Sequence, residues 1–160
     1  MKNLQEIISE LEVKGYSLVE NLLPNAIVEK VRMDISNRLA KVPFGDNNFV
    51  GMRTKRLYSL FGETRSVDEI AINEKILEIV KEYCGDILLG ASVACQIYPG
   101  ETEQAFHFDD GIYPLPSDFR DVNVGVIWAL DDFTIDNGAT VVIPNSHKKR
   151  DMKNPEKFDH

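Results

Sequence analysis

The sequence predicts an α+β fold in which helices pack on the outside of a sheet or barrel. Up to about residue 85 the apolar residues recur at helical spacing, and from Ile87 onward they alternate as in strands. A run of helices followed by a run of strands is typical of an α+β architecture. Because 160 residues without a repeat or linker suit one core, we expect a single domain over 1–160, mainly helical to about residue 85 and with a β-core from about residue 86.

Local signals place the first two helices. Apolar residues on one face predict a helix over 3–13, which Gly15 ends. A short strand is expected next, over 16–19. Pro24 is suited to open a second helix, because its ring fixes a helical φ and a first-turn residue does not need its N–H. The apolar stripe of this second helix runs to Leu39.

The next stretch combines a loop, a basic cluster and a third helix. Glycines bound a loop over 45–51, and the basic cluster 53–56 is expected on an exposed loop, with an anionic substrate as the alternative partner. Ser66 and Glu69 have the spacing of a capping box, in which a hydroxyl and a carboxylate satisfy helix-end amides reciprocally. A helix is predicted over 74–83, closed by a following glycine.

The C-terminal half predicts several strands joined by turns. The alternating pattern over 92–98 assigns its side chains to two faces. The face expected to pack on the helices carries Val93, Cys95 and Ile97, and the face expected to line a barrel interior carries Ala94, Gln96 and Tyr98. Further strands are predicted over 122–130 and 139–143, with a tight-turn signal at 136–138.

Composition excludes several classes of partner. Lys and Arg total 18 against 26 Asp and Glu, which gives a net charge of −8. That balance disfavours nucleic acid and anionic membrane surfaces, because both require a basic face. No segment has the length of apolar residues that a membrane span needs, and the acidic N-terminal segment does not have the pattern of a signal peptide. With only two cysteines, a disulfide framework is not expected, and we predict a cytoplasmic location.

His107 and Asp109 form the main candidate site. Side chains at i and i+2 of a strand point to one face with their Cα atoms about 6.5–7 Å apart, so the two can bind one ion together. An imidazole, a carboxylate and one more His make the facial triad of non-haem Fe(II) oxygenases. The H-x-D pattern alone arises often by chance, and the preceding strand and Pro-Gly turn strengthen it. Asp110 is expected to point away from the ion.

The ordered set of motifs resembles the phytanoyl-CoA dioxygenase-like family. The resemblance covers nearly the whole chain and is far more specific than H-x-D by itself. The motifs that carry it are Gly15-Tyr16, Pro99-Gly100-Glu101, His107 to Asp110, Trp128 to Thr134, Asn137 to Thr140, and Pro144 to His147. It implies an Fe(II)- and 2-oxoglutarate-dependent dioxygenase that hydroxylates a small-molecule substrate with O2. The implied fold is a double-stranded β-helix (jelly-roll or cupin-like) core with the N-terminal helices packed outside.

The resemblance also implies roles for individual residues. His107 and Asp109 become the first two iron ligands, and the presence of Asp109 favours hydroxylation over halogenation. Trp128 corresponds to a position that borders the 2-oxoglutarate pocket, with a core aromatic as the alternative reading. Gln96 corresponds to a polar contact to the co-substrate, with a satisfied buried amide as the alternative.

Residues after the metal motif are candidates for the substrate entrance. Tyr113 and Arg120 lie in the segment that follows directly, and they would shape specificity there. Ordinary loop packing explains both residues as well.

The sequence leaves the third protein ligand to the iron unassigned. The family has a later His, and beyond it an Arg that binds 2-oxoglutarate, and neither element is found in the sequence. We therefore expect the N-terminal part of such an enzyme, lacking the last strands of its barrel. A second hypothesis is a complete enzyme that recruits His147 or His160 as third ligand. A third is a non-catalytic remnant of the fold that binds a small molecule or a protein partner.

Overall fold

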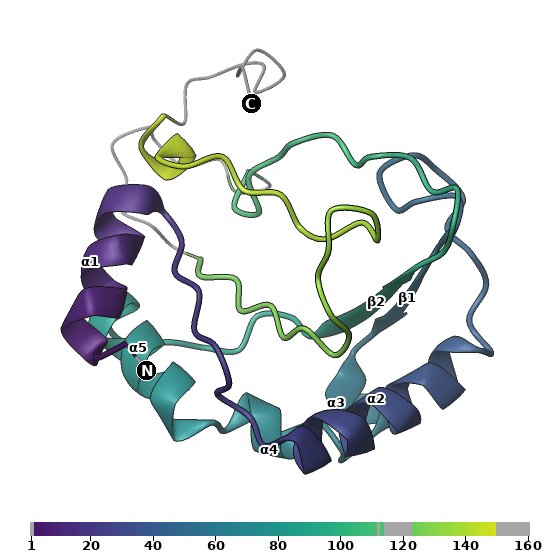
Figure 1. The fold of residues 1–160 in the computed structure, drawn as a ribbon, viewed down its shortest axis with the longest axis horizontal. Coiled ribbons are helices and arrows are strands. Elements are labelled where there is room, and N and C mark those ends of the chain that lie inside the picture. The colour runs from purple at the N-terminus through teal and green to yellow at the C-terminus, as the bar shows by residue number, and fades with distance from the viewer. Residues whose placement is uncertain (1, 112, 114–122, 150–160) are drawn as a thin grey trace.

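The computed structural model describes residues 2–111, 113 and 123–149 and confirms the α+β class (Figure 1). All five α-helices of this part of the chain precede residue 85, and a two-stranded sheet accompanies them. The elements in order are α1 (Leu4–Lys14), α2 (Asn25–Leu39), β1 (Thr54–Tyr58), α3 (Leu60–Glu63), α4 (Asp68–Ala71), α5 (Glu74–Cys84), β2 (Val93–Ile97) and the 3-10 turn η1 (Ser146–Lys148). None of the described helices has the length and apolar character that crossing a membrane would require.

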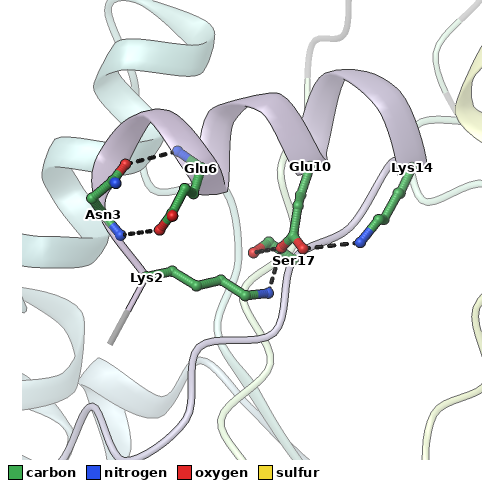
Figure 2. A network of polar contacts seen from close by, with 6 residues as sticks. All are labelled: Lys2, Asn3, Glu6, Glu10, Lys14 and Ser17. Carbon is green, nitrogen blue, oxygen red and sulfur yellow. Dashed lines mark hydrogen bonds and ion pairs between the residues drawn. The ribbon is translucent and has the colours of Figure 1, made fainter.

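The α1 and α5 predictions are confirmed because strong local signals define both ends. Asn3 and Glu6 form a capping box (Figure 2). At the other end of α1, the backbone N–H of Gly15, at φ +84°, donates to the carbonyl of Leu11. In α5 the side chain of Asn73 accepts the N–H of Ile76. The two helices pack together at one end of the molecule, where Ile7 and Ile79 are buried (Figure 1).

The capping box predicted at Ser66 is wrong. α4 begins after Val67 without a side-chain cap, and the Ser66 hydroxyl donates to Asp34 in α2 at 2.7 Å. The hydroxyl of Thr64 donates to the same carboxylate oxygen. These two bonds, with partial desolvation opposing them and Arg38 adding to them, hold the pKa of Asp34 below its ordinary value. The tertiary contact to α2 therefore displaces the local cap.

Pro24 opens α2 as predicted, and α2 supplies most of the central core. Val31, Ile35 and Leu39 line its buried face. The other buried members of the cluster are Leu57, Leu60, Val67 and Ile70, and the partly buried residues packed against it include Ala94, Trp128 and Leu130. Burial of this apolar surface is the main favourable term that holds α2 to the sheet.

The basic cluster 53–56 was predicted on an exposed loop, but all of it except Arg53 lies in strand β1, so that prediction is wrong. β1 pairs antiparallel with β2, from Thr54 opposite Ile97 to Tyr58 opposite Val93. The ammonium of Lys55 donates to the carbonyls of Leu39 and Ala40 at 3.1 Å each. A cation at the last turn of a helix satisfies carbonyls that have no partner within the helix. Lys55 therefore joins the sheet to α2.

The two faces predicted for β2 are reversed. Ala94 lies opposite the buried Leu57 and packs against the helical core. Val93 and Ile97, expected to meet the helices, are 42% and 45% exposed. Because β-strand side chains alternate, the register that buries Leu57 also places Ala94 and Gln96 on the helix side.

The strands predicted over 16–19 and 139–143, and the described residues 123–130 of the strand predicted over 122–130, are not assigned as strands. Within the described residues, β1 and β2 form the only sheet. An alternating pattern marks the two faces of an extended segment, but a strand also needs a hydrogen-bonded neighbour. Figure 1 shows these later segments running extended across the molecule. The jelly-roll arrangement stays a prediction.

Candidate metal centre

His107 and Asp109 lie side by side, as the i, i+2 spacing predicts. Nε2 of His107 is 3.2 Å from Oδ1 of Asp109. Both side chains are accessible from solvent, 37% and 67% exposed. A nitrogen and a carboxylate oxygen at this separation are two donors that one divalent ion can share.

A backbone carbonyl lies against one nitrogen of the His107 ring. Nδ1 is 3.0 Å from the carbonyl oxygen of Ala105. Because a carbonyl only accepts, Nδ1 is the donor of this bond, and Nε2 is the nitrogen that faces Asp109. A metal-binding His commonly donates its other ring N–H in this way, so the ring fits the role of a ligand that would bind an ion through Nε2. Asp109 provides the anionic oxygen beside Nε2.

The segment that carries the two donors is tied to the loop before β1. The side-chain amide of Gln104 donates to the carbonyl of Phe49 at 2.8 Å. Earlier in the segment, Glu101 accepts the N–H of Arg53 at 2.6 Å and the hydroxyl of Thr54 at 2.8 Å. Partial desolvation opposes ionisation of Glu101, but these bonds outweigh it and lower the pKa of its carboxyl. The segment that carries His107 and Asp109 therefore begins at a turn that hydrogen bonds from Glu101 hold to Arg53 and Thr54.

Gly125 borders the carboxylate of Asp109 from the extended segment after the metal motif. A Cβ at Gly125 would lie 3.4 Å from Oδ2 of Asp109, which is ordinary van der Waals contact. The segment 123–130 therefore passes next to the candidate centre, as expected for a wall of the site. Asp110, predicted to point away, sits in the turn that follows, where its carbonyl accepts the N–H of Tyr113.

The structure places His147 away from the pair formed by His107 and Asp109. Nε2 of His147 lies 3.2 Å from the carbonyl oxygen of Glu12, and the ring packs against Gly15. The Asn145 N–H also donates to the carbonyl of Lys14 at 2.8 Å, so η1 lies on the C-terminal end of α1. Within the described residues no three His, Cys, Asp or Glu side chains come together as metal ligands.

The other candidate residues lie in three different settings. Trp128 packs against the helical core, which agrees with its reading as a core aromatic. Gln96 lies on the helix-facing side of β2, and its side-chain oxygen accepts the Tyr98 hydroxyl at 3.1 Å. Tyr113 is exposed in the turn after the metal motif. Arg120 and His160 lie outside the described residues.

Phe49 and Gln104, which contact or hold the segment of His107 and Asp109, were not predicted from the sequence, and Glu101 was predicted only as part of the motif Pro99-Gly100-Glu101. Only Asn47 gave a local signal, because Asn often bonds backbone N–H groups two residues on and forms a turn. Its side chain does accept the N–H groups of Phe49 and Val50. The contacts of Gln104 and Glu101 span 47 to 55 residues of sequence, so no local pattern reveals them.

Comparisons with known proteins identify the family of this chain. The family model "Phytanoyl-CoA dioxygenase (PhyH)" matches residues 11–160. Dioxygenase olcK of Penicillium canescens is 27% identical over 164 residues, covering 92% of this chain and 54% of the relative. Dioxygenase FUM3 of Gibberella moniliformis is 28% identical over 165 residues, covering 91% of this chain and 55% of the relative. The chain thus spans about half the length of these curated relatives, and it belongs to the phytanoyl-CoA dioxygenase family.

Proposed function

We propose that this chain belongs to a non-haem dioxygenase that uses Fe(II), 2-oxoglutarate and O2 to hydroxylate a small organic substrate. The observation that carries the proposal is the 3.2 Å approach of His107 Nε2 to Asp109 Oδ1 in a member of this family. The relatives named as dioxygenases support the reaction class. Substrate choice would depend on loops around the centre, for which Tyr113 and Arg120 are our candidates.

His107 and Asp109 would hold the iron, which when bound supplies the activation of O2 that no amino acid side chain provides. His107 is suited to this role because its Nδ1 donates to the carbonyl of Ala105 and its Nε2 faces Asp109. Asp109 contributes a negative charge that offsets part of the ion's charge and keeps its carboxylate on the same side as Nε2. A carboxylate at this position favours hydroxylation.

We further propose that 1–160 forms part of one jelly-roll domain with its helices outside. The antiparallel β1–β2 pair and the helices α2 to α4 packed against it support this arrangement. A third protein ligand and a cation for the 2-oxoglutarate carboxylate would complete the site, because two ligands hold Fe(II) weakly and the co-substrate is a dianion.

A second candidate function is a non-catalytic binding module of the same family. The observation in its favour is that, among the described residues, no third His, Cys, Asp or Glu joins His107 and Asp109 as a metal ligand. Such a protein would bind a small acid or a protein partner and would not turn over 2-oxoglutarate.

Anaerobic titration of the purified protein with Fe(II), followed by an assay of succinate release from 2-oxoglutarate in air, separates these candidates. We expect iron binding in the wild type and its loss in His107→Ala and Asp109→Ala. Asp86→Ala, at an exposed carboxylate in a different loop, is the matched control and should bind as the wild type does. Iron binding with succinate release supports the oxygenase. A wild type that binds no iron and releases no succinate would contradict it and favour the binding module.

His147→Ala tests the hypothesis of a third ligand in the same titration. Because the His147 ring is bonded to the end of α1, we expect this variant to keep its affinity for iron. Loss of binding in a folded variant would instead support His147 as a ligand.

A further inference from the structure

An aromatic contact links the loop before β1 to the candidate ligand His107. The ring of Phe49 meets the His107 imidazole with their centroids 5.0 Å apart and their planes at 65°, an edge-on arrangement. Aromatic pairs favour such geometry because the positive edge of one ring meets the negative face of the other. Phe49 belongs to the loop 45–53, which no motif of the sequence marked as functional.

Two hydrogen bonds hold the backbone of Phe49 in place. Its N–H donates to the side-chain oxygen of Asn47 at 3.0 Å, and its carbonyl accepts from the Gln104 side chain at 2.8 Å. Asn47 also accepts the N–H of Val50, and its carbonyl accepts the N–H of Gly51 at 2.8 Å. Both backbone groups of Phe49 are therefore fixed, one of them by the segment that carries His107.

A second anchor holds the far end of the same loop. Glu101 accepts hydrogen bonds from Arg53 and Thr54, and it packs directly against Gly51. A Cβ at Gly51, whose φ is +100°, would lie 2.5 Å from Thr54 Oγ1 and 2.6 Å from Glu101 Oε2. Only glycine allows this close approach. The loop 45–53 and the segment 101–107 thus form one bonded unit.

Because the His107 side chain is exposed to solvent, a packing contact such as that with Phe49 can stabilise its orientation. Water competes for the hydrogen bond between His107 Nδ1 and the Ala105 carbonyl, because the His107 side chain is more than one-third exposed. The imidazole can rotate about its Cβ–Cγ bond, and contacts that are open to water restrict this rotation only weakly. The edge-on contact with Phe49 adds an apolar contact that favours the observed orientation of the ring.

We propose that Phe49 is a positioning residue for His107, holding the imidazole in the orientation that directs Nε2 toward Asp109 and toward the ion that the two side chains would bind. The metal-binding consequence rests on the proposed function, whereas the effect on the ring does not. Asn47 and Gln104 act through Phe49, because they fix its backbone.

The first test reads the imidazole directly, in the protein without added metal. The sequence has three histidines, so ¹⁵N–¹H correlation spectra resolve each ring, and His107→Ala assigns its signals. In the wild type we expect narrow ring signals for His107, because the imidazole keeps one orientation. Phe49→Ala should broaden these signals as the ring exchanges between orientations, and Phe49→Tyr should restore the wild-type line widths. Unchanged line widths of His107 in Phe49→Ala would overturn the proposal.

Phe44→Ala is the matched control. Phe44 is similarly exposed and also makes an edge-on aromatic contact, but to Tyr98 rather than to His107. It should leave the His107 line widths unchanged, whereas equal broadening in both variants would overturn a specific role of Phe49. Gln104→Ala, which keeps Phe49 but removes the bond to its carbonyl, should broaden the His107 signals as Phe49→Ala does.

The second test measures the affinity for Mn(II), a redox-stable substitute for Fe(II), by calorimetry. Loss of a group that orients a metal-binding His weakens binding roughly 10–100-fold, and we expect Phe49→Ala near the lower end, with Phe49→Tyr close to the wild type. Equal affinities of Phe49→Ala and the wild type would overturn the proposed effect on binding while leaving the proposed function in place. A wild type without affinity for the ion would contradict the proposed function, and the line widths of the His107 ring signals would still decide the role of Phe49.

Discussion

The carbonyl oxygen of Glu12 accepts a hydrogen bond from Nε2 of His147 at 3.2 Å, which joins the end of α1 to η1 across 135 residues of sequence. Because the carbonyl only accepts, Nε2 carries the proton, and Nδ1 is left as a buried acceptor without a partner among the described residues. The His147 ring lies over Gly15, where a Cβ would be 2.3 Å from Nδ1. The Pro-Asn-Ser-His motif therefore docks on the helix cap in this structure.

This contact predicts that Gly15→Ala destabilises the fold for two separable reasons. The φ of +84° costs a non-glycine residue about 1–2 kcal/mol, and the added methyl group also collides with the His147 ring. We therefore expect a loss of about 2–3 kcal/mol in the free energy of unfolding, measured by urea denaturation.

The double variant Gly15→Ala/His147→Ala isolates the collision. His147→Ala alone should cost about 1–2 kcal/mol through the lost hydrogen bond and packing. Together the two changes should cost less than the sum of the single changes, because the methyl group no longer meets a ring. Additive effects would show that the ring does not press on Gly15 in solution.

Local signals explain which parts of the fold were predictable. α1, α2 and α5 were found because Gly15, Pro24 and the apolar stripes act within a few residues of the helix that they define. Strand β1 was not predicted, because its basic residues are typical of an exposed loop. Its strand character comes from pairing with β2 and from the reach of Lys55 to the end of α2, which are contacts between distant parts of the chain.

In the candidate site, too, the local contact was predicted and the contacts between distant parts of the chain were not. The approach of His107 to Asp109 agrees with the prediction from their i, i+2 spacing, although residues 107–109 are not assigned as a strand. The support from Phe49 and Glu101 depends on how the loop 45–53 folds back on the segment 101–107, which no pattern encodes. The reversed faces of β2 have the same cause, because the register with β1 decides which residues meet the helices.

Leu57 tests the assignment of the core. It is buried in the cluster around α2, so Leu57→Ala should leave a cavity and lower the free energy of unfolding by about 2–4 kcal/mol. Leu88→Ala is the matched control, because Leu88 is 97% exposed and should change the stability by less than about 0.5 kcal/mol. Urea denaturation of both variants measures the difference. Equal midpoints would contradict the register that places Leu57 beneath α2.

The contacts of Glu10 predict that the stability of the fold decreases at acidic pH. Its carboxylate accepts from Lys2 at 2.5 Å, Ser17 at 2.6 Å and Lys14 at 2.9 Å (Figure 2). These three contacts, with Lys2 contributing most, lower the pKa of Glu10 from 4.5 to about 2. A carboxyl whose pKa is lower in the folded state binds fewer protons there than in the unfolded chain. Its contribution is therefore complete above pH 4.5 and is lost as the pH falls toward about 2.

Glu10→Gln removes this titration, so its thermal midpoint should fall less steeply than that of the wild type as the pH is lowered through this window. The difference between the two proteins should be largest above pH 4.5 and should shrink toward about pH 2. Added salt should reduce it, because the group is at the surface and mobile ions screen its attraction to Lys2 and Lys14. Glu20→Gln, at an exposed position outside α1, is the control and should follow the wild-type profile. Parallel profiles of Glu10→Gln and the wild type would mean that Lys2 and Lys14 do not hold the carboxylate in solution.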